Sequence, residues 1–283
     1  MPSTRDIRRR IKSVKGTAQI TKAMQMVASS KMRKAQQAAL HGRPFAALAR
    51  ELMDHAVLGA PDFTHPLLEV REGGRTALIV VGTDKGLCGA LNANLFREVG
   101  RYDPARTLFL AVGKKAAQFL ARTRRNLVAE FTYADTPTYG QSHAIATAAA
   151  DLFLKGEVNQ VEVLYTRFIN TLSQKPDVLR LLPMVDPAER AAARTGARPE
   201  YLFEPSAAEV IGTLLTYELT FQVGQLLLEA RASEHSARMV AMKNATENAQ
   251  QLIKDLTLEY NKMRQANITK ELLEIATAQM ALG

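Results

Sequence analysis

The clearest structural signal in the chain is the stretch Met242-Lys-Asn-Ala-Thr-Glu-Asn-Ala-Gln-Gln-Leu-Ile-Lys-Asp-Leu256. Five apolar or small side chains follow one another in it at steps of three and four: Met242, Ala245, Ala249, Leu252 and Leu256. This is the heptad spacing that keeps one stripe of a helix against a partner helix. Beyond it, Tyr260 and Met263 continue the stripe with a four and a three, which predicts a drift of the seam, as at a stutter.

The helix that carries this stripe is expected to be long. From Gln225 to Leu282 there is no glycine and no proline. As a helix this segment would run about 87 Å, at about 1.5 Å per residue. Ser206, followed by Glu209 and preceded by Pro205, has the pattern of a capping box and predicts that the helix begins near Ser206.

The N-terminal end has the same character. From Ser3 to His41 the only helix breaker is Gly16, and Ser3 followed by Asp6 resembles a capping box. An apolar or small stripe runs along it: Ile7, Ile11, Val14, Ala18, Thr21, Met24 and Ala28. The two ends are therefore predicted to pair with each other. No repeat of 20 to 50 residues is found, which disfavours a solenoid.

The middle of the chain has the pattern of an α/β fold, because apolar strand-like runs alternate with helix-like stretches. The expected strands are Thr76–Val81, Leu108–Val112 and Gln160–Thr166, with Val178–Leu182 added as an antiparallel strand by a hairpin. The expected helices are Ala90–Val99, Lys114–Ala121 and His143–Leu154. Asp186–Glu200 is interpreted as an exposed connector. The predicted domains are an N-terminal coiled-coil helix over 1–60, a Rossmann-like α/β domain over 75–204 and a C-terminal coiled-coil helix over 206–283.

Composition narrows the possible functions. No run of 18 apolar residues occurs without a charge, so no membrane span is expected. The net charge of +9 is concentrated at one end, because residues 1–43 carry eleven lysines and arginines and a single acid, Asp6. A basic segment of this kind could bind nucleic acid, target a mitochondrion or lie against an acidic protein surface.

The candidate catalytic patterns are weak. The loop Gly82-Thr-Asp-Lys-Gly-Leu-Cys-Gly89 follows a strand and precedes a helix, as phosphate-binding loops do, but Lys85 precedes Gly86 instead of following it as in a P-loop. A tight strand-to-helix turn is the simpler interpretation. The five histidines lack metal-ligand spacing, and the single cysteine, Cys88, is more simply a small buried hydrophobe. We expect no catalytic residue, no cofactor and no metal in this chain.

Three hypotheses remain from the residues alone. The first is a basic helical shaft within a polar or acidic collar of partner proteins. The second is a basic coiled-coil module that binds nucleic acid, although no aromatic residue for base stacking occurs before Phe45. The third is a nucleotide-dependent enzyme that uses the α/β domain. Composition by itself does not choose among them.

Four long segments resemble the γ subunits of F-type ATP synthases. One lies in the N-terminal helix, at Ile11-Lys-Ser-Val-Lys-Gly-Thr-Ala-Gln-Ile-Thr-Lys-Ala-Met24, continued by Val27–Lys34. Another is the loop that opens the α/β domain, Thr83-Asp-Lys-Gly-Leu-Cys-Gly-Ala-Leu-Asn92. The other two lie in the C-terminal helix, at Ser236–Asn248 and Asn261–Ile275. The resemblance spans the whole chain in order. It implies a long antiparallel coiled coil of the terminal helices and a Rossmann-like α/β domain.

The resemblance also implies a function and a set of partners. The chain would be the central rotor of the enzyme, standing inside a ring of α and β subunits and facing the ε subunit and the c-ring. Proton-driven rotation of the ring would turn it and change the conformation of each catalytic β subunit. The chain would bind no nucleic acid. It would lie on the cytoplasmic face of a bacterial cell membrane as a peripheral protein, and since no presequence precedes the basic helix, a bacterial source is expected.

The resemblance assigns contact residues as well. The residues implied to grip the catch loops of the β subunits are Arg238, Arg264, Gln265, Thr269 and Glu271, with Met24 near them on the N-terminal helix. The residues implied to face the c-ring and ε are Tyr201, Phe203 and Glu204. We also expect no thiol switch, because a regulatory cysteine-bearing insert is absent.

Overall fold

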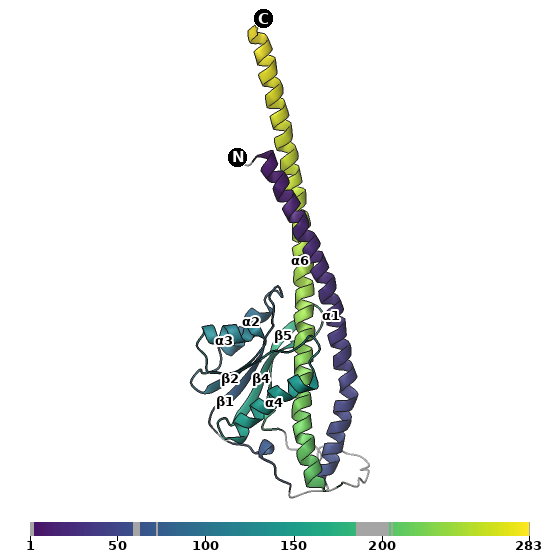
Figure 1. Ribbon diagram of the computed structural model, residues 1–283, viewed down its shortest axis with the longest axis vertical. Coiled ribbons are helices and arrows are strands. Elements are labelled where there is room, and N and C mark those ends of the chain that lie inside the picture. Colours follow the sequence, from purple (N-terminus) through teal and green to yellow (C-terminus); the bar gives the residue numbers. More distant parts are fainter. Residues whose placement is uncertain (1–2, 59–62, 72, 185–203, 205, 283) are drawn as a thin grey trace. The chain divides into compact units, whose positions relative to one another are not determined.

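The computed structural model describes residues 3–58, 63–71, 73–184, 204 and 206–282 (Figure 1). The chain divides into two compact units. One unit joins Met1–Ala28 to Arg238–Gly283, and the other comprises Ser29–Ala237. Two long helices run through both units: α1 spans Thr4–Leu58 and α6 spans Ala207–Leu282.

The unit of residues 29–237 is built around a five-stranded sheet with the order β3-β2-β1-β4-β5. The strands are β1 (Thr76–Val81), β2 (Thr107–Val112), β3 (Leu127–Phe131), β4 (Gln160–Phe168) and β5 (Gln174–Leu182). The first four are parallel, whereas β5 pairs antiparallel with β4. The connecting helices are α2 (Leu91–Val99), α3 (Lys114–Arg122) and α4 (Tyr139–Leu154), and a short 3-10 turn, η1, spans Pro66–Leu68. The predicted Rossmann-like α/β class is confirmed.

Alternate residues of β1 face two different layers of helices, as the two-residue period of a strand requires. Leu78 and Val80 pack into a cluster with buried residues of α2 and α3. Ala77, Ile79 and Val81 pack into the other cluster, which contains residues of α4 and of the first part of α6. Within α6 the contributing side chains are Ile211, Leu215, Leu219, Val223, Leu226, Leu227 and Ala230. This part of the long helix is therefore a layer of the α/β fold.

Most expected elements occur where the sequence predicted them. The strand Thr76–Val81 has the predicted bounds, and the late strand by hairpin is β5. Helix α4 begins at Tyr139, four residues before the predicted His143, because Thr138 and Gln141 form a capping box. The sequence prediction missed β3, whose residues alternate between partial burial and exposure at the edge of the sheet. The proposed connector Asp186–Glu200 lies outside the described residues.

Both long helices begin at the predicted caps. The Ser3 hydroxyl accepts a hydrogen bond from the Asp6 amide at 3.2 Å, and the Asp6 carboxylate accepts one from the Ser3 amide. The Ser206 hydroxyl likewise accepts a hydrogen bond from the Glu209 amide at 3.3 Å. Each side-chain oxygen satisfies an amide that the first helical turn leaves without a partner.

In the other unit, α1 and α6 are antiparallel. The hydroxyls of Thr21 and Thr246 lie 2.7 Å apart, and Arg8 donates to the Tyr260 hydroxyl at 2.6 Å. Residue numbers fall along α6 as they rise along α1, which confirms the predicted antiparallel pairing. The guanidinium of Arg8 also lies over the Tyr260 ring, 5.4 Å from its centroid.

The seam of α6 differs in one respect from the prediction. Leu252 is 45% exposed, so its assignment to the seam was wrong, and Ile253 is partly buried in its place. The inward-facing residues are Met242, Thr246, Ala249, Ile253, Leu256, Tyr260 and Met263. These alternate regularly at steps of four and three, so the predicted stutter is also wrong. The threonine pair explains the difference, because a polar residue, Thr246, holds a core position that an apolar pattern overlooks.

Candidate functional site

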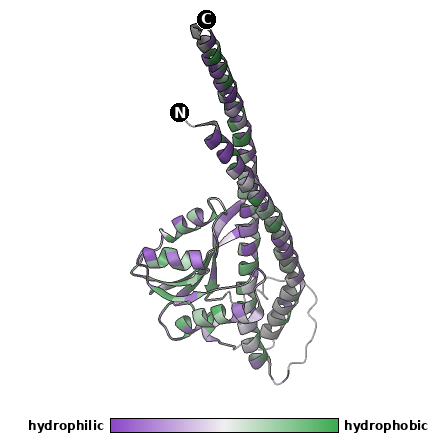
Figure 2. Ribbon diagram, turned by 45° about the horizontal axis from the view of Figure 1, so that its top comes forward, coloured by the Kyte–Doolittle hydropathy of each residue, from purple (hydrophilic) through white to green (hydrophobic). Residues whose placement is uncertain are grey.

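The C-terminal part of α6 presents the predicted grip residues to solvent. Arg264, Gln265, Thr269 and Glu271 are all exposed and lie within two turns of the helix. The Thr269 hydroxyl donates to the Gln265 carbonyl at 3.0 Å, which is a bond within the helix. Every residue from 264 to 277 is exposed, including several large apolar ones: Ile268, Leu272, Leu273 and Ile275. Figure 2 shows hydrophobic and hydrophilic residues interspersed along the C-terminal part of α6.

The structure does not place Met24 and Arg238 at that level. Met24 is partly buried and, three residues after Thr21, faces the turn of α6 around Lys243, three residues before Thr246. Arg238 lies about one and a half turns from Lys243 and is 9% exposed. Arg264 is about 30 Å farther along the helix than Lys243. The six residues therefore fall into two groups: Met24 with Arg238, and the four exposed residues near the end of α6.

The residues predicted to face the c-ring and ε cannot be placed as a group. Tyr201 and Phe203 lie outside the described residues. Glu204 is described and is exposed, two residues before the cap of α6 at Ser206.

The loop from Gly82 to Gly89 is closely packed where it leaves β1, and its residues Lys85, Leu87 and Gly89 are exposed. A Cβ atom at Gly113, whose φ is +93°, would lie 2.5 Å from the Gly82 carbonyl oxygen. Asn92 donates to the Thr83 hydroxyl at 2.7 Å, and that hydroxyl donates to the Lys85 carbonyl at 2.8 Å. The polar groups of Thr83 are thus bonded within the loop and to α2, as a structural turn requires.

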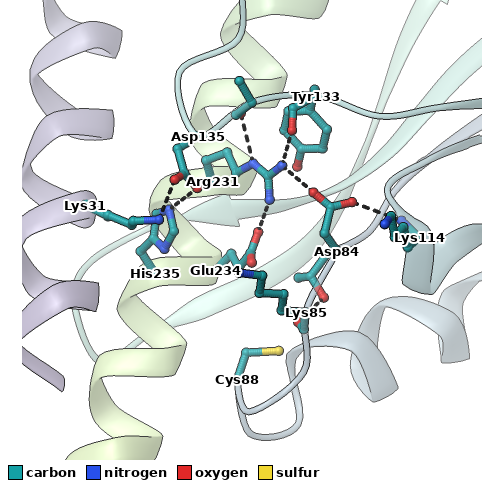
Figure 3. A network of polar contacts seen from close by, with 12 residues as sticks. Lys31, Asp84, Lys85, Cys88, Lys114, Tyr133, Asp135, Arg231, Glu234 and His235 are labelled. Carbon is teal, nitrogen blue, oxygen red and sulfur yellow. Dashed lines mark hydrogen bonds and ion pairs between the residues drawn. The ribbon is translucent and has the colours of Figure 1, made fainter. Parts of the chain in front are cut away.

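A buried arginine on α6 lies beside this loop (Figure 3). Arg231 is 3% exposed. Its guanidinium donates to the Glu234 carboxylate at 2.6 Å, to the Asp84 carboxylate at 2.8 Å and to the Ala134 carbonyl at 3.2 Å. It also donates to the Tyr133 carbonyl and lies over the Tyr133 ring, 3.7 Å from the centroid. A planar group with five donors can make all these bonds at once, whereas a lysine cannot.

Two loops of the sheet hold these partners in place. Asp84 follows β1, and its second oxygen accepts from the Lys114 amide at 3.1 Å, at the start of α3. Tyr133 and Ala134 follow β3. In doubly wound folds, ligands commonly bind outside the carboxyl ends of the parallel strands. Here the side chain of Arg231 occupies that region.

A second set of contacts adjoins the first and reaches α1. Asp135 accepts a hydrogen bond from Lys31 at 2.5 Å, and its other oxygen lies 3.2 Å from the His235 Nε2 atom. His235 is 3% exposed, whereas the side chains of Lys31 and Asp135 are about half exposed. Asp135 therefore connects α1 and α6 to the loop after β3.

The surroundings of Arg231 and Asp135 favour the charged form of each. Burial acts to lower the pKa of Arg231, but the charge of Glu234 and the hydrogen bonds to Asp84 and Glu234 outweigh it and raise that pKa. Burial acts to raise the pKa of Asp135, yet the hydrogen bond from Lys31 and the charges of His235, Lys31 and Arg231 hold it below its ordinary value. Burial raises the pKa of the Tyr133 phenol, which stays neutral.

The sequence analysis missed this cluster because no local pattern marks it. Arg231 and Asp84 are 147 residues apart, and each taken alone resembles a solvated charge. One weak signal was available. Small residues surround the arginine on α6 at Ala230, Ala232 and Ser233, and such residues permit the close packing that buries residues 230–236 continuously.

Over the described parts of the helices, no segment combines the length and apolarity that crossing a membrane requires. Within the same described ranges, no three histidine, cysteine, aspartate or glutamate side chains are grouped so that they could hold a metal ion.

Comparisons with known proteins cover the full length of the chain. A family model described as ATP synthase matches residues 3–282. The ATP synthase gamma chain of Methylacidiphilum infernorum is 45% identical over 293 residues and covers 100% of both chains. The ATP synthase gamma chain of Roseiflexus castenholzii is 50% identical over 292 residues, which is 100% of this chain and 99% of the relative.

The fold is also similar to that of a solved structure. A chain in the cryo-EM structure of the central stalk and c-ring of the Tetrahymena thermophila mitochondrial ATP synthase aligns with a TM-score of 0.62 and 27% identity. The alignment covers 80% of this chain and 99% of the other.

Proposed function

This chain belongs to the ATP synthase gamma chain family, and on that premise we propose that its long helices form the central shaft of the enzyme. Rotation of a c-ring, driven by protons, turns the shaft, and the shaft's orientation selects the conformation of each catalytic β subunit. The antiparallel pairing of α1 and α6 is the observation that carries this proposal, because two helices locked in register resist twisting better than one.

In this proposal the chain itself catalyses no reaction. Nucleotide chemistry takes place on partner subunits, and this chain acts on those subunits through the rotational orientation of its long helices. The Gly82–Gly89 loop supports this assignment, because its Thr83 and Asp84 side chains are bonded to the chain's own groups. The α and β subunits, the ε subunit and the c-ring are the proposed partners. The proposed location is the cytoplasmic face of a bacterial cell membrane, as a peripheral protein.

The exposed end of α6 is the proposed grip on the β subunits. Arg264, Gln265, Thr269 and Glu271 offer donors and acceptors there, and the guanidinium of Arg264 suits a carboxylate on a partner. Arg238 and Met24 would contact the partner subunits at a second position, nearer to the start of α6 than the four exposed residues. Tyr201, Phe203 and Glu204 remain the proposed contacts with the c-ring and ε.

The grip is tested in the assembled enzyme with Arg264→Ala and Gln265→Ala combined. We expect the ATPase rate to fall about fivefold. This corresponds to the loss of roughly 1 kcal/mol of contact energy that stabilises the transition state of the rate-limiting step more than its ground state. Gln251→Ala with Asp255→Ala is the matched control, because this exposed hydrogen-bonded pair lies on the same helix between the two groups of proposed contacts. An ATPase rate equal to that of the control, with the chain incorporated, would remove the grip assignment.

A further inference from the structure

Six charged or titratable side chains join three parts of the unit of residues 29–237. We name this set the helix clamp: Lys31 of α1, Asp84 and Asp135 of the loops after β1 and β3, and Arg231, Glu234 and His235 of α6 (Figure 3). Figure 3 shows the side chains from the helices and the loops converging on Arg231 and Asp135. Their contacts form two adjoining sets, since Arg231 and His235 lie a single turn apart on the same helix.

The helix clamp resists displacement because the side chains at its centre are buried. Arg231, Glu234 and His235 are each 3% exposed. Removing one partner of a buried ion pair leaves the other charge without compensation, so any displacement of α6 from the two loops is strongly opposed. The apolar contacts of α6 farther along the same face can slide with less penalty, because dispersion forces do not depend on one fixed geometry.

The position of the helix clamp along both helices is informative. Helix α6 passes from one compact unit to the other between Ala237 and Arg238, directly after His235. Helix α1 makes the same passage between Ala28 and Ser29, just before Lys31. The clamp thus holds each helix within about one turn of the residue at which it leaves the α/β unit.

We propose that the helix clamp transmits torque between the α/β fold and the two long helices at their point of exit. This inference rests on the proposed shaft function. Arg231 is the central positioning residue: it fixes the rotational setting of α6 against the loops after β1 and β3, and Asp135 fixes α1 through Lys31. With a weakened clamp, the helices would still rotate when no proton transport opposes the rotation. When rotation has to drive proton transport, the helices would move relative to the α/β fold and part of the torque would be lost.

The experiment uses the complete enzyme in sealed vesicles, with ATP-driven proton uptake followed by a pH-sensitive dye and ATP hydrolysis measured in parallel. The variants are Arg231→Met, which keeps an unbranched stem and removes the guanidinium with its charge, Arg231→Lys, which keeps the charge, and Lys31→Met. Arg101→Met is the matched control, because Arg101 makes a 2.5 Å ion pair with Glu98 at the surface of the same unit and is 75% exposed.

We expect Arg231→Met to lower proton uptake per ATP hydrolysed by about two- to thirtyfold, the range that a network residue exerts on coupling. Hydrolysis by the detached head should change by less than about twofold, because no load opposes rotation there. Arg231→Lys should recover part of the uptake. Lys31→Met should lower it less than Arg231→Met, because its ion pair is half exposed.

Two results would overturn the proposal. One is an assembled Arg231→Met enzyme that takes up as many protons per ATP as the Arg101→Met control. If Arg231→Met does not assemble, Lys31→Met decides, and uptake equal to the control's again overturns it. Failure of the shaft function itself looks different: the wild-type chain would then not co-purify with an ATPase.

Discussion

At the scale of single residues, the half-exposed Asp135 gives the structure a dependence on pH. Its pKa is held below the ordinary value of 3.8, with Lys31 as the main opposing influence to burial. Because the folded-state pKa is depressed, the carboxylate stabilises the fold above pH of about 4, and this contribution is lost as the pH falls through the lowered pKa. The contribution is at most about 1 kcal/mol, since solvent screens a half-exposed pair.

Asp135→Asn is the variant that tests this residue. In urea unfolding of the purified chain, we expect it to be less stable than the wild type at neutral pH, and we expect the difference to shrink as the pH falls below about 4 and through the lowered pKa. Asp151→Asn makes the same chemical change at an exposed site on α4. A stability difference for Asp135→Asn that stays constant over the whole pH range would contradict the assignment.

At the scale of elements, the seam between α1 and α6 distinguishes two leucines that the sequence pattern treated alike. Leu256 is 6% exposed and Leu252 is 45% exposed. We expect Leu256→Ala to cost about 2–5 kcal/mol of unfolding free energy, because it leaves a cavity in the seam. Leu252→Ala should cost less than about 1 kcal/mol, as exposed substitutions do. Thermal unfolding followed by circular dichroism compares the two, and equal losses would refute the observed seam.

At the scale of the whole molecule, the exposed end of α6 contrasts with the sheet. Residues 264–277 bury no side chain within the chain, whereas β1 is almost entirely inaccessible. An unsupported helical end is marginal in water. In hydrogen–deuterium exchange of the isolated chain, we expect residues 264–277 to exchange faster than β1 by at least about two orders of magnitude.

The assembled enzyme provides the comparison for this experiment. If the end of α6 is gripped by partner subunits, its amides should become protected on assembly, while those of β1 change little. Exchange at residues 264–277 that is as fast in the assembled enzyme as in the isolated chain would contradict a partner contact at this end.

The sequence by itself determined what depends on local patterns. Three such patterns are the lack of glycine and proline from Gln225 to Leu282, the caps at Ser3 and Ser206 and the apolar run Thr76–Val81. Each depends only on neighbouring residues, so helices, strands and the α/β class could be predicted. Tertiary structure decided what depends on distant partners. Thr246 belongs in the seam because Thr21 bonds to it, β3 forms because β2 pairs with it, and Arg231 is buried because Asp84, 147 residues away, offers a carboxylate. A buried charge is stable only when its partners are in place, and no local pattern records where the fold brings them.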